Sequence, residues 1–410
     1  MIFVLFFFFI CILMYFEYKR TKLIFNYFSL FLIYWYLYTI GIFFSGEELT
    51  QYNLFAAELI LIGGLFFIIG YYFFPLGSKS FYQKKIEKLN KLPNIKIFLL
   101  LLTFVALAFF IYIVFIKIGF QNYFFTSRAN RSLIVRPYSK IMIFIDLFNI
   151  ISSIALLFYI KTKKRFYKYI FILVFTVGLF HAILTISRNN LVLLIFPIVY
   201  ILHYYNYLKT KAILLLLLTG VLVASLWKVV LGSLFLYGNL DLGLMLQNFK
   251  FPREFIVWQE ISNNLLSKEQ LYLYGKSYIE AFSNFIYPHH VENLSLWYVR
   301  NYEPHVFEIG GGRGFSNILE AYLNFDILGV IVIFFILGNL VYLFQLKSRN
   351  NIVLFLSYAF SLSFIHRIFR SDFVSLTKTW WWMYFISFVF LFTLFKILKK
   401  VSSEGKLFNK

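Results

Sequence analysis

The stretch IFLLLLTFVALAFFIYIVFIKI, from Ile97 to Ile118, contains one charged residue, Lys117. A helix needs about 20 apolar residues to cross a bilayer core of roughly 30 Å. Runs of this kind recur along all 410 residues, and the chain is 61% hydrophobic and 14% charged, with a mean hydropathy of +0.77. Soluble folds do not bury this much apolar surface. The sequence therefore predicts an all-α polytopic membrane protein.

The apolar runs predict about eleven transmembrane helices. They fall at about 1–16, 23–44, 53–74, 97–118, 139–160, 168–186, 190–208, 212–237, 318–344, 351–366 and 377–396. One connection, from about Gly238 to Ser316, is far longer than the others, and a loop of this length is usually functional. Within it, Glu254–Leu266 and Ser277–Ile286 have the pattern of amphipathic helices.

Basic residues predict the orientation of these helices. Short basic clusters separate successive pairs of spans, and the positive-inside rule places them all in the cytoplasm. The clusters are Lys19–Lys22, Lys79–Lys96, Lys161–Arg165, Lys209–Lys211, Lys347–Arg349 and the tail from Lys396. The N-terminus is then outside, the C-terminus is cytoplasmic, and the long loop is periplasmic. The predicted parts are 1–237 with eight helices, the loop 238–316, 317–400 with three helices, and the tail 401–410.

Lysine and arginine differ in their predicted distribution. The net charge is +21, but no basic soluble domain is present to bind nucleic acid. Twenty of the 27 lysines lie on the cytoplasmic side, whereas nine of the twelve arginines lie outside. Those nine are Arg128, Arg131, Arg136, Arg188, Arg253, Arg300, Arg313, Arg367 and Arg370. The guanidinium fork matches phosphate and carboxylate groups better than lysine does. The asymmetry favours an arginine-lined cavity that faces outward and binds a phosphorylated, lipid-borne ligand. The alternative is that these arginines pair with acidic residues of the loops or with lipid headgroups.

The spacing of these arginines gives a more specific prediction. Arg128 and Arg131 are three residues apart, as are Arg367 and Arg370, so each pair would share a face of a helix. Arg188 stands in a tight turn between two spans, where an ionisable group is a functional candidate.

A glycine-rich segment precedes the predicted helix at 318–344. Gly310 to Gly314, with Arg313 among them, would let backbone N–H groups form an anion site at the helix start, and Gly312 and Gly314 are assigned to it. The alternative is a flexible hinge. Asn317 and Glu320 have the spacing of a capping box, which places the helix start near Ile318.

The acidic residues in or near the spans can be explained by structural roles. Glu320 is explained by its capping role, although it stays a candidate catalytic residue. We assign no catalytic or binding role to Asp326, Glu58 or Asp146. The sequence has no metal-binding motif, and we predict a protein without a metal or another cofactor.

These residues resemble a known family. GRGFSNILEAYLNFDILGVIVIFFILGNL, Gly312 to Leu340, is similar to the late-helix motif of the O-antigen polymerases, the Wzy-type oligosaccharide repeat-unit polymerases. The matching positions are Gly314, Phe315, Ser316, Glu320, Tyr322, Asn324, Phe325 and Gly329. The SRNN turn at Ser187–Asn190 and the late arginine pair are also similar. Asp326 stands where the family usually has glycine.

The resemblance implies a glycosyltransferase of the bacterial inner membrane. Such enzymes join undecaprenyl-diphosphate-linked repeats of O-antigen or a related surface polysaccharide at the periplasmic face, and a chain-length regulator is the expected partner. Arg188, Arg253, Arg313, Arg367, Arg370, Arg128 and Arg131 are then the candidate ligands of the diphosphate and glycan.

The acceptor hydroxyl needs a general base. His366 is the first candidate, because neighbouring Arg367 disfavours its protonated form. The following candidates are His289 and His290, then Glu320 and Glu254. An O-antigen ligase or another lipid-linked glycosyltransferase remains an alternative, as does a lipid-linked oligosaccharide flippase, against which the long outer loop and the outer arginines count.

Overall fold

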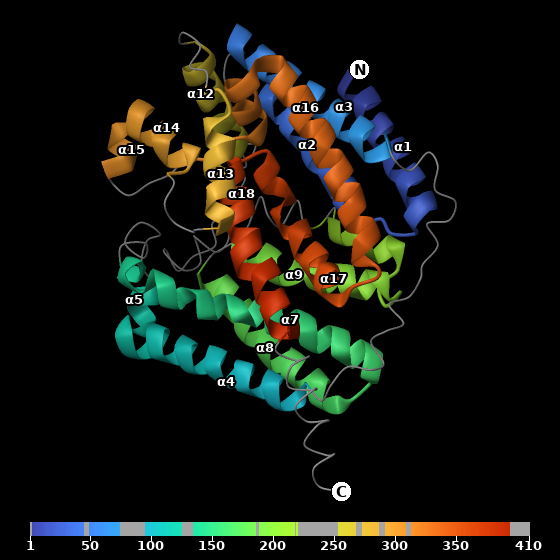
Figure 1. Cartoon of the computed structure of the whole chain (residues 1–410), viewed down its shortest axis with the longest axis vertical. Coiled ribbons are helices and arrows are strands. Elements are labelled where there is room, and N and C mark those ends of the chain that lie inside the picture. The colour runs from blue at the N-terminus through green and yellow to red at the C-terminus, as the bar shows by residue number, and fades with distance from the viewer. Residues whose placement is uncertain are drawn as a thin grey trace, which may run out of the picture. The chain divides into compact units, whose positions relative to one another are not determined.

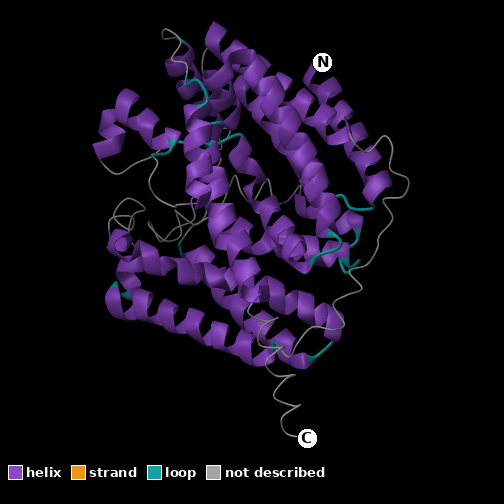
Figure 2. Ribbon diagram, viewed as in Figure 1, coloured by secondary structure: helices purple, strands orange, loops and turns teal. Residues whose placement is uncertain are grey.

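The computed structural model describes residues 2–44, 49–73, 95–124, 134–185, 188–217, 219, 253–267, 273–286, 292–308 and 313–393. Within these residues, all regular secondary structure is helical (Figure 2). The chain forms two compact units. The first comprises residues 1–83, 208–346 and 361–379, and the second comprises 84–207, 347–360 and 380–410.

The first unit contains the N-terminal helices and most of the C-terminal ones (Figure 1). Its helices are α1 (Ile2–Thr21), α2 (Tyr27–Phe43), α3 (Gln51–Phe73), α12 (Arg253–Leu266), α13 (Lys276–Ile286), α14 (Leu294–Tyr302), α15 (Pro304–Glu308), α16 (Asn317–Ser348, its last two residues in the second unit), the 3-10 helix η5 (Leu362–Ile368) and α18 (Phe373–Thr379). The amphipathic helices predicted in the long loop are confirmed as α12 and α13.

The second unit is built around α7, which packs against α4, α8 and α9 (Figure 1). Its helices are α4 (Lys96–Ile111), the π-helix η3 (Tyr112–Lys117), α5 (Phe120–Phe124), the 3-10 helix η4 (Arg136–Tyr138), α7 (Ser139–Thr162), α8 (Arg165–Leu184), α9 (Arg188–Tyr204), α17 (Ile352–Ser361, its last residue in the first unit) and the π-helix η6 (Trp380–Ile386).

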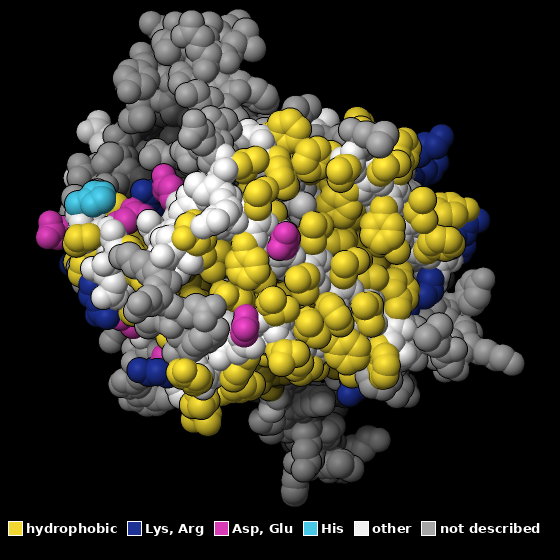
Figure 3. All heavy atoms as spheres, turned by 90° about the horizontal axis from the view of Figure 1, so that it is seen from above, with side chains coloured by type: hydrophobic (Ala, Val, Ile, Leu, Met, Phe, Trp, Pro, Cys, Tyr) yellow, Lys and Arg dark blue, Asp and Glu magenta, His cyan; other side chains and the backbone are white. Residues whose placement is uncertain are grey.

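Six helices of the described chain are long and apolar enough to cross a membrane. They are Ile2–Thr21, Gln51–Phe73, Lys96–Lys117, Ile145–Thr162, Arg165–Leu184 and Asn317–Ser348. Shorter apolar helices lie at Tyr27–Phe43, Arg188–Tyr204 and Ile352–Ile368. One view shows a broad hydrophobic face with only scattered acidic side chains, as lipid contact requires (Figure 3). The protein is a polytopic membrane protein, and the count of eleven spans and their orientation stay predictions.

Small residues bring α3 and α16 into close contact. A Cβ atom at Gly70 would lie 2.1 Å from the backbone oxygen of Phe335, and one at Gly338 would lie 2.2 Å from that of Phe67. Only glycine permits this approach, which is the usual means of packing helices within a membrane.

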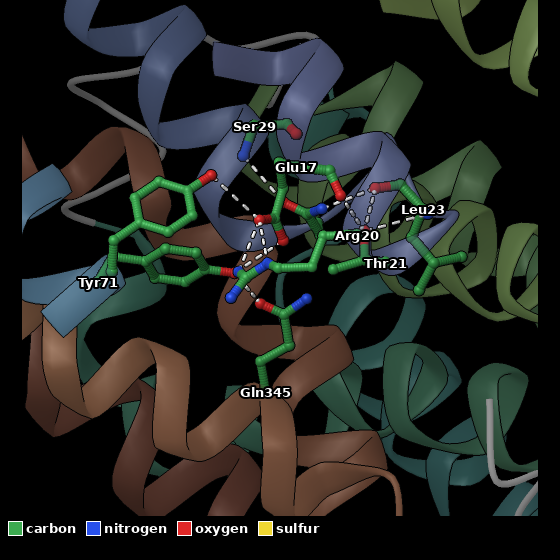
Figure 4. Close-up of polar contacts among 9 residues, drawn as sticks. Glu17, Arg20, Thr21, Leu23, Ser29, Tyr71 and Gln345 are labelled. Atoms are coloured by element: carbon green, nitrogen blue, oxygen red, sulfur yellow. Dashed lines mark hydrogen bonds and ion pairs between the residues drawn. The ribbon is translucent and has the colours of Figure 1, made fainter. Parts of the chain in front are cut away.

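A buried ion pair within α1, between Glu17 and Arg20, contacts side chains of α3 and α16 (Figure 4). The Glu17 carboxylate accepts hydrogen bonds from Nε and Nη2 of Arg20, at 3.0 and 2.6 Å, and lies 2.8 Å from the Tyr71 hydroxyl. That hydroxyl also contacts the side-chain oxygen of Gln345. The Arg20 guanidinium lies 5.0 Å from the centres of the Tyr71 and Tyr72 rings, so cation–π contacts add to the ion pair. These contacts compensate the charges of α1 and fix it to the other two helices.

Helix α16 is interrupted where the sequence predicts a continuous span. Phe325 has φ −147° and ψ 24°, and Asp326 has φ 58° and ψ −157°. The break separates a first segment, Asn317 to Asn324, from the longer apolar part of the helix. Asp326 therefore occupies a conformation that suits glycine, which accounts for the glycine that the family resemblance implies at this position.

Candidate active site

The start of α16 holds a loop that carries two of the predicted ligand-binding arginines. We call residues 367–373 the arginine loop. The backbone N–H of Phe315 donates to the backbone oxygen of Arg370 at 2.9 Å. The side-chain nitrogen of Asn317 donates to the backbone oxygen of Ser371 at 2.7 Å. The segment that resembles the family motif therefore binds the backbone of the arginine loop.

Gly314 makes this contact possible. A Cβ atom there would lie 3.0 Å from both Cγ and the backbone oxygen of Arg370. A larger residue would push the two backbones apart and weaken the hydrogen bond between Phe315 and Arg370. The described part of the glycine segment thus has a packing role, and the anion site predicted there stays a prediction.

The capping box predicted for this helix is wrong. Helix α16 begins at Asn317, one residue before the predicted start, and the hydroxyl of Ser316 caps it by accepting from the backbone N–H of Ile318 at 3.1 Å. Asn317 faces the arginine loop instead. Glu320 is fully buried, and its carboxylate makes contacts with other elements.

Glu320 joins the arginine loop to α13. Its Oε2 accepts from the backbone N–H of Phe373 at 2.6 Å, and its Oε1 accepts from the hydroxyl of Ser277 at 2.6 Å. The side-chain nitrogen of Asn324, one turn further along α16, donates to the Ser277 hydroxyl at 2.8 Å. A carboxylate that already accepts a hydroxyl hydrogen has the geometry that a general base needs.

A second buried carboxylate, Asp372, stands beside Glu320 in the arginine loop. It is fully buried and directly precedes Phe373, whose backbone N–H donates to Glu320. Asp372 accepts from the backbone N–H groups of Ser375 in α18, at 2.8 Å, and of Ser295 in α14, at 3.3 Å. It therefore fixes the start of α18 and connects the arginine loop to the predicted outer loop.

Further contacts hold the loop from the side of α12. The indole N–H of Trp258 donates to the backbone oxygen of Phe369 at 2.8 Å, and Trp258 is buried. The arginine loop is thus bound by α12, α13, α14 and α16 before any ligand arrives, which is how sites that stabilise charge are preorganised.

Arg313 has carboxylate partners in the predicted outer loop. Its Nε donates to Glu303 at 2.7 Å, and its Nη1 lies 3.4 Å from a carboxylate oxygen of Glu260. Its backbone oxygen accepts from the hydroxyl of Ser295. These contacts tie α12, α14 and the start of α16 together. The alternative of pairing with loop acids therefore describes Arg313 in this structure, and its predicted contact with diphosphate is untested.

The predicted arginine pair does not share a helix face. Arg367 is in η5, which ends at Ile368, and Arg370 follows in a turn. The Nη1 of Arg367 lies 3.3 Å from the backbone oxygen of Ser375 and 3.4 Å from the Thr379 hydroxyl. Both arginines are half-buried, and so is His366.

The segment that contains this site matches a known family. Residues 257–401 match the model of the family O-antigen polysaccharide polymerase Wzy. The match confirms the predicted resemblance and includes Arg313, Glu320 and the whole arginine loop. It covers about a third of the chain, and residues 1–256 lie outside it. Comparison with curated proteins finds no significant match, and comparison with solved structures finds none either.

Several predicted site residues lie outside the described part of the chain. These are Arg128, Arg131, Gly312, His289 and His290.

The remaining predicted positions lie at helix starts or in the predicted outer loop. Arg253 is the first residue of α12, but its side chain is not described, and the same holds for Glu254 and Arg136. Arg188 is the first residue of α9, and α8 ends at Leu184. Arg300 pairs with Glu292 at 2.7 Å.

Three residues that lie in the arginine loop, or that contact this loop or Glu320, were not predicted as site residues from the sequence. Asp372 ends the motif HRIFRSD, and its position two residues after Arg370 is the one signal that marked it. Ser277 and Trp258 lie in loop helices, where nothing in the sequence indicates that they contact residues 369–373 or Glu320.

A half-open apolar pocket lies on another face of α16. Its volume is about 300 Å³, and its walls come from α3, the end of α12 and α16. Its lining residues are Gln51, Tyr52, Phe55, Leu265, Leu266, Tyr322 and Leu323. Tyr322 points away from the face that carries Glu320 and Asn324, because two residues turn a helix by about 200°. Glu320 and Asn324 are not among the lining residues of this pocket.

Two chemical capacities result from this geometry. Half-buried arginines on a braced loop can stabilise a developing anionic charge. Buried Glu320 contacts the backbone of the same loop at Phe373, and its carboxylate accepts the Ser277 hydroxyl hydrogen. Among the described residues, no group of three or more His, Cys, Asp or Glu side chains is placed to hold a metal ion.

Proposed function

We propose that this protein polymerises undecaprenyl-diphosphate-linked repeat units of O-antigen or a related surface polysaccharide. The single observation that carries the proposal is the coincidence of the Wzy match, residues 257–401, with the braced arginine loop. The reaction takes place at the periplasmic face of the bacterial inner membrane, in keeping with the predicted orientation. A chain-length regulator is the proposed partner.

Arg367 and Arg370 are the proposed ligands of the diphosphate. When the bond between the anomeric carbon and the diphosphate breaks, the electron pair stays on the leaving oxygen. Guanidinium groups stabilise that charge through paired N–H donors. The proposed reaction uses these donors rather than a metal. Arg188, Arg253, Arg128 and Arg131 are proposed to contact the second diphosphate or the glycan.

His366 and Glu320 are the two described candidates for the general base. His366 is half-buried next to Arg367, and its ring centre lies 6.1 Å from that of Tyr34. Glu320 is fully buried and accepts a hydroxyl hydrogen already.

A deletion strain tests the proposed function through its lipopolysaccharide profile. A polymerase deletion is expected to leave one repeat on the lipid A core, and the wild-type gene should restore the ladder. Uncapped core with accumulated lipid-linked polymer would point to a ligase instead. Uncapped core with single repeats retained on the inner leaflet would point to a flippase. Either result would overturn the proposal.

A further inference from the structure

Four polar side chains form a buried cluster between α13 and α16. Ser277, Glu320 and Asn324 are hydrogen-bonded to one another, and Tyr278 follows Ser277 in α13 with its ring centre 5.4 Å from that of Phe373. We call the four residues the α13–α16 cluster. Ser277 donates to Glu320 at 2.6 Å, and the Asn324 side chain donates to Ser277 at 2.8 Å and to the backbone oxygen of Glu320 at 2.7 Å. Glu320 has no exposed surface, and Tyr278 is 8% exposed. Polar groups buried in this way require partners.

Two atoms of the cluster have no partner within the described chain. They are the hydroxyl oxygen of Tyr278 and the side-chain oxygen of Asn324, whose residue is 1% exposed. Burial, together with the nearby charge of Glu320, raises the pKa of Tyr278 well above its usual value, so its hydroxyl stays a donor. The Asn324 oxygen is an acceptor. A buried donor and a buried acceptor left open in one cluster require a polar partner, which is either water or a hydroxyl group of a ligand.

Aromatic rings border the cluster. The Tyr278 ring lies parallel to that of Phe325, with centres 6.2 Å apart and planes 4° apart, and the edge of Phe373 approaches it at 5.4 Å. Phe325 is 47% exposed, so the cluster is close to the surface at the break in α16. Aromatic faces beside hydroxyl-binding groups suit a sugar, which has both apolar C–H and polar O–H faces.

The Ser277 hydroxyl shows where a sugar hydroxyl would bind. It donates to Oε1 of Glu320, while Oε2 is held by the backbone of Phe373. Rotation of the small serine side chain would release Oε1 to another hydroxyl. The Tyr278 hydroxyl would then donate to one neighbouring hydroxyl group of the same sugar, and the Asn324 side-chain oxygen would accept from another.

We propose that the α13–α16 cluster binds the terminal acceptor sugar and that Glu320 removes the proton from its attacking hydroxyl. This inference rests on the proposed polymerase function. In the reaction, the acceptor oxygen forms a bond to the anomeric carbon of the donor chain, and the bond from that carbon to the lipid diphosphate breaks. The diphosphate leaves with the electron pair, and the hydroxyl proton passes to the Glu320 carboxylate and then to water.

Tyr278→Phe tests the binding site, because it removes one hydroxyl and retains the ring. The substrate is the lipid-linked repeat extracted from the polymerase deletion strain, supplied to the full-length protein in proteoliposomes. We expect KM to rise about 3- to 10-fold, the range for loss of one hydrogen bond, while the thermal midpoint is unchanged or raised. Tyr204→Phe is the matched control, because it removes another buried hydroxyl without a partner in the described chain, in α9.

The outcomes separate this inference from the proposed function. Inactive wild-type protein with this substrate would count against the polymerase itself. Active wild-type protein with the same KM in Tyr278→Phe and Tyr204→Phe would show that the open hydroxyl meets at most a buried water, and the acceptor site would be refuted.

Glu320→Gln tests the base. Glutamine keeps an oxygen for the Phe373 N–H and places its NH₂ group against the Ser277 oxygen, so the fold should be retained. We expect kcat to fall by about 10²- to 10⁴-fold, the usual contribution of a general base, with a smaller change in KM. Full activity in Glu320→Gln together with loss of kcat in His366→Ala would move the base to His366 and overturn the assignment.

Discussion

Replacing Gly314 by alanine tests whether the start of α16 braces the arginine loop. The added Cβ atom would lie 3.0 Å from the backbone oxygen and from Cγ of Arg370. That oxygen accepts the hydrogen bond from Phe315, whose length is 2.9 Å, so it cannot move away without weakening the bond. Alanine at this position therefore acts directly on the position of Arg370.

The expected magnitude follows from the groups involved. Loss of a buried backbone hydrogen bond costs about 1–3 kcal/mol. Alanine offsets about 0.4–1 kcal/mol of this by restricting the unfolded chain. The net destabilisation is then about 0–2.6 kcal/mol, with a midpoint near 1.3 kcal/mol. Displacement of Arg370 by a few tenths of an ångström should also slow turnover about tenfold, since catalysis depends steeply on position.

Thermal unfolding of the purified protein and its rate of polymer formation provide the measurements. Gly178→Ala is the matched control, because a Cβ atom at Gly178 in α8 would meet Leu194 at 3.4 Å and Phe148 at 3.6 Å, which is ordinary contact. The control should be neutral or stabilising, as alanine is favoured inside helices. If both variants unfold at the same temperature and polymerise at the wild-type rate, the bracing role of Gly314 is refuted.

Three further variants test other parts of the structure. Asp326→Gly should raise the thermal midpoint. It relieves about 1–3 kcal/mol of backbone strain at this position. This gain exceeds the loss of the 2.7 Å hydrogen bond from the Ile327 N–H to the Asp326 side chain. Asp326→Ala should lower the thermal midpoint, and the opposite order would contradict the strained conformation. Arg313→Lys should cost about 1 kcal/mol or less, because lysine cannot keep both the contact of Nε with Glu303 and the contact of Nη1 with Glu260. Abolished polymer formation at unchanged stability would instead support the predicted contact of Arg313 with diphosphate. Arg367→Lys keeps the charge and loses the planar fork, so polymerisation should slow at least tenfold, and an unchanged rate would remove Arg367 from the diphosphate site.

Much of the fold was predictable from local sequence signals. Apolar runs located α1, α2, α3, α4, α7, α8 and α9, and amphipathic patterns located α12 and α13 to within one residue. The break in α16 was not predicted, because Phe325 and Asp326 stand inside an uninterrupted helical pattern. Only the resemblance to a family with glycine at this position marked it as unusual.

The site was predictable in outline, because arginine position and the family motif both pointed to the same end of α16. The partners of Glu320 and Asn317 could not be predicted, because the spacing of the two residues also fits a capping box. The structure shows that Ser316 caps the helix, which leaves Asn317 and Glu320 to contact the arginine loop. Contacts with Ser277, about 40 residues earlier, depend on tertiary structure that local patterns do not encode.

Reconstitution of the purified protein tests the proposed function most directly. Proteoliposomes would contain the full-length chain and the lipid-linked repeat extracted from the deletion strain, with no other protein. We predict a ladder of polymer lengths, with one lipid diphosphate released for each new glycosidic bond. Intact repeats and no released lipid diphosphate, from folded protein at any substrate concentration, would contradict the polymerase.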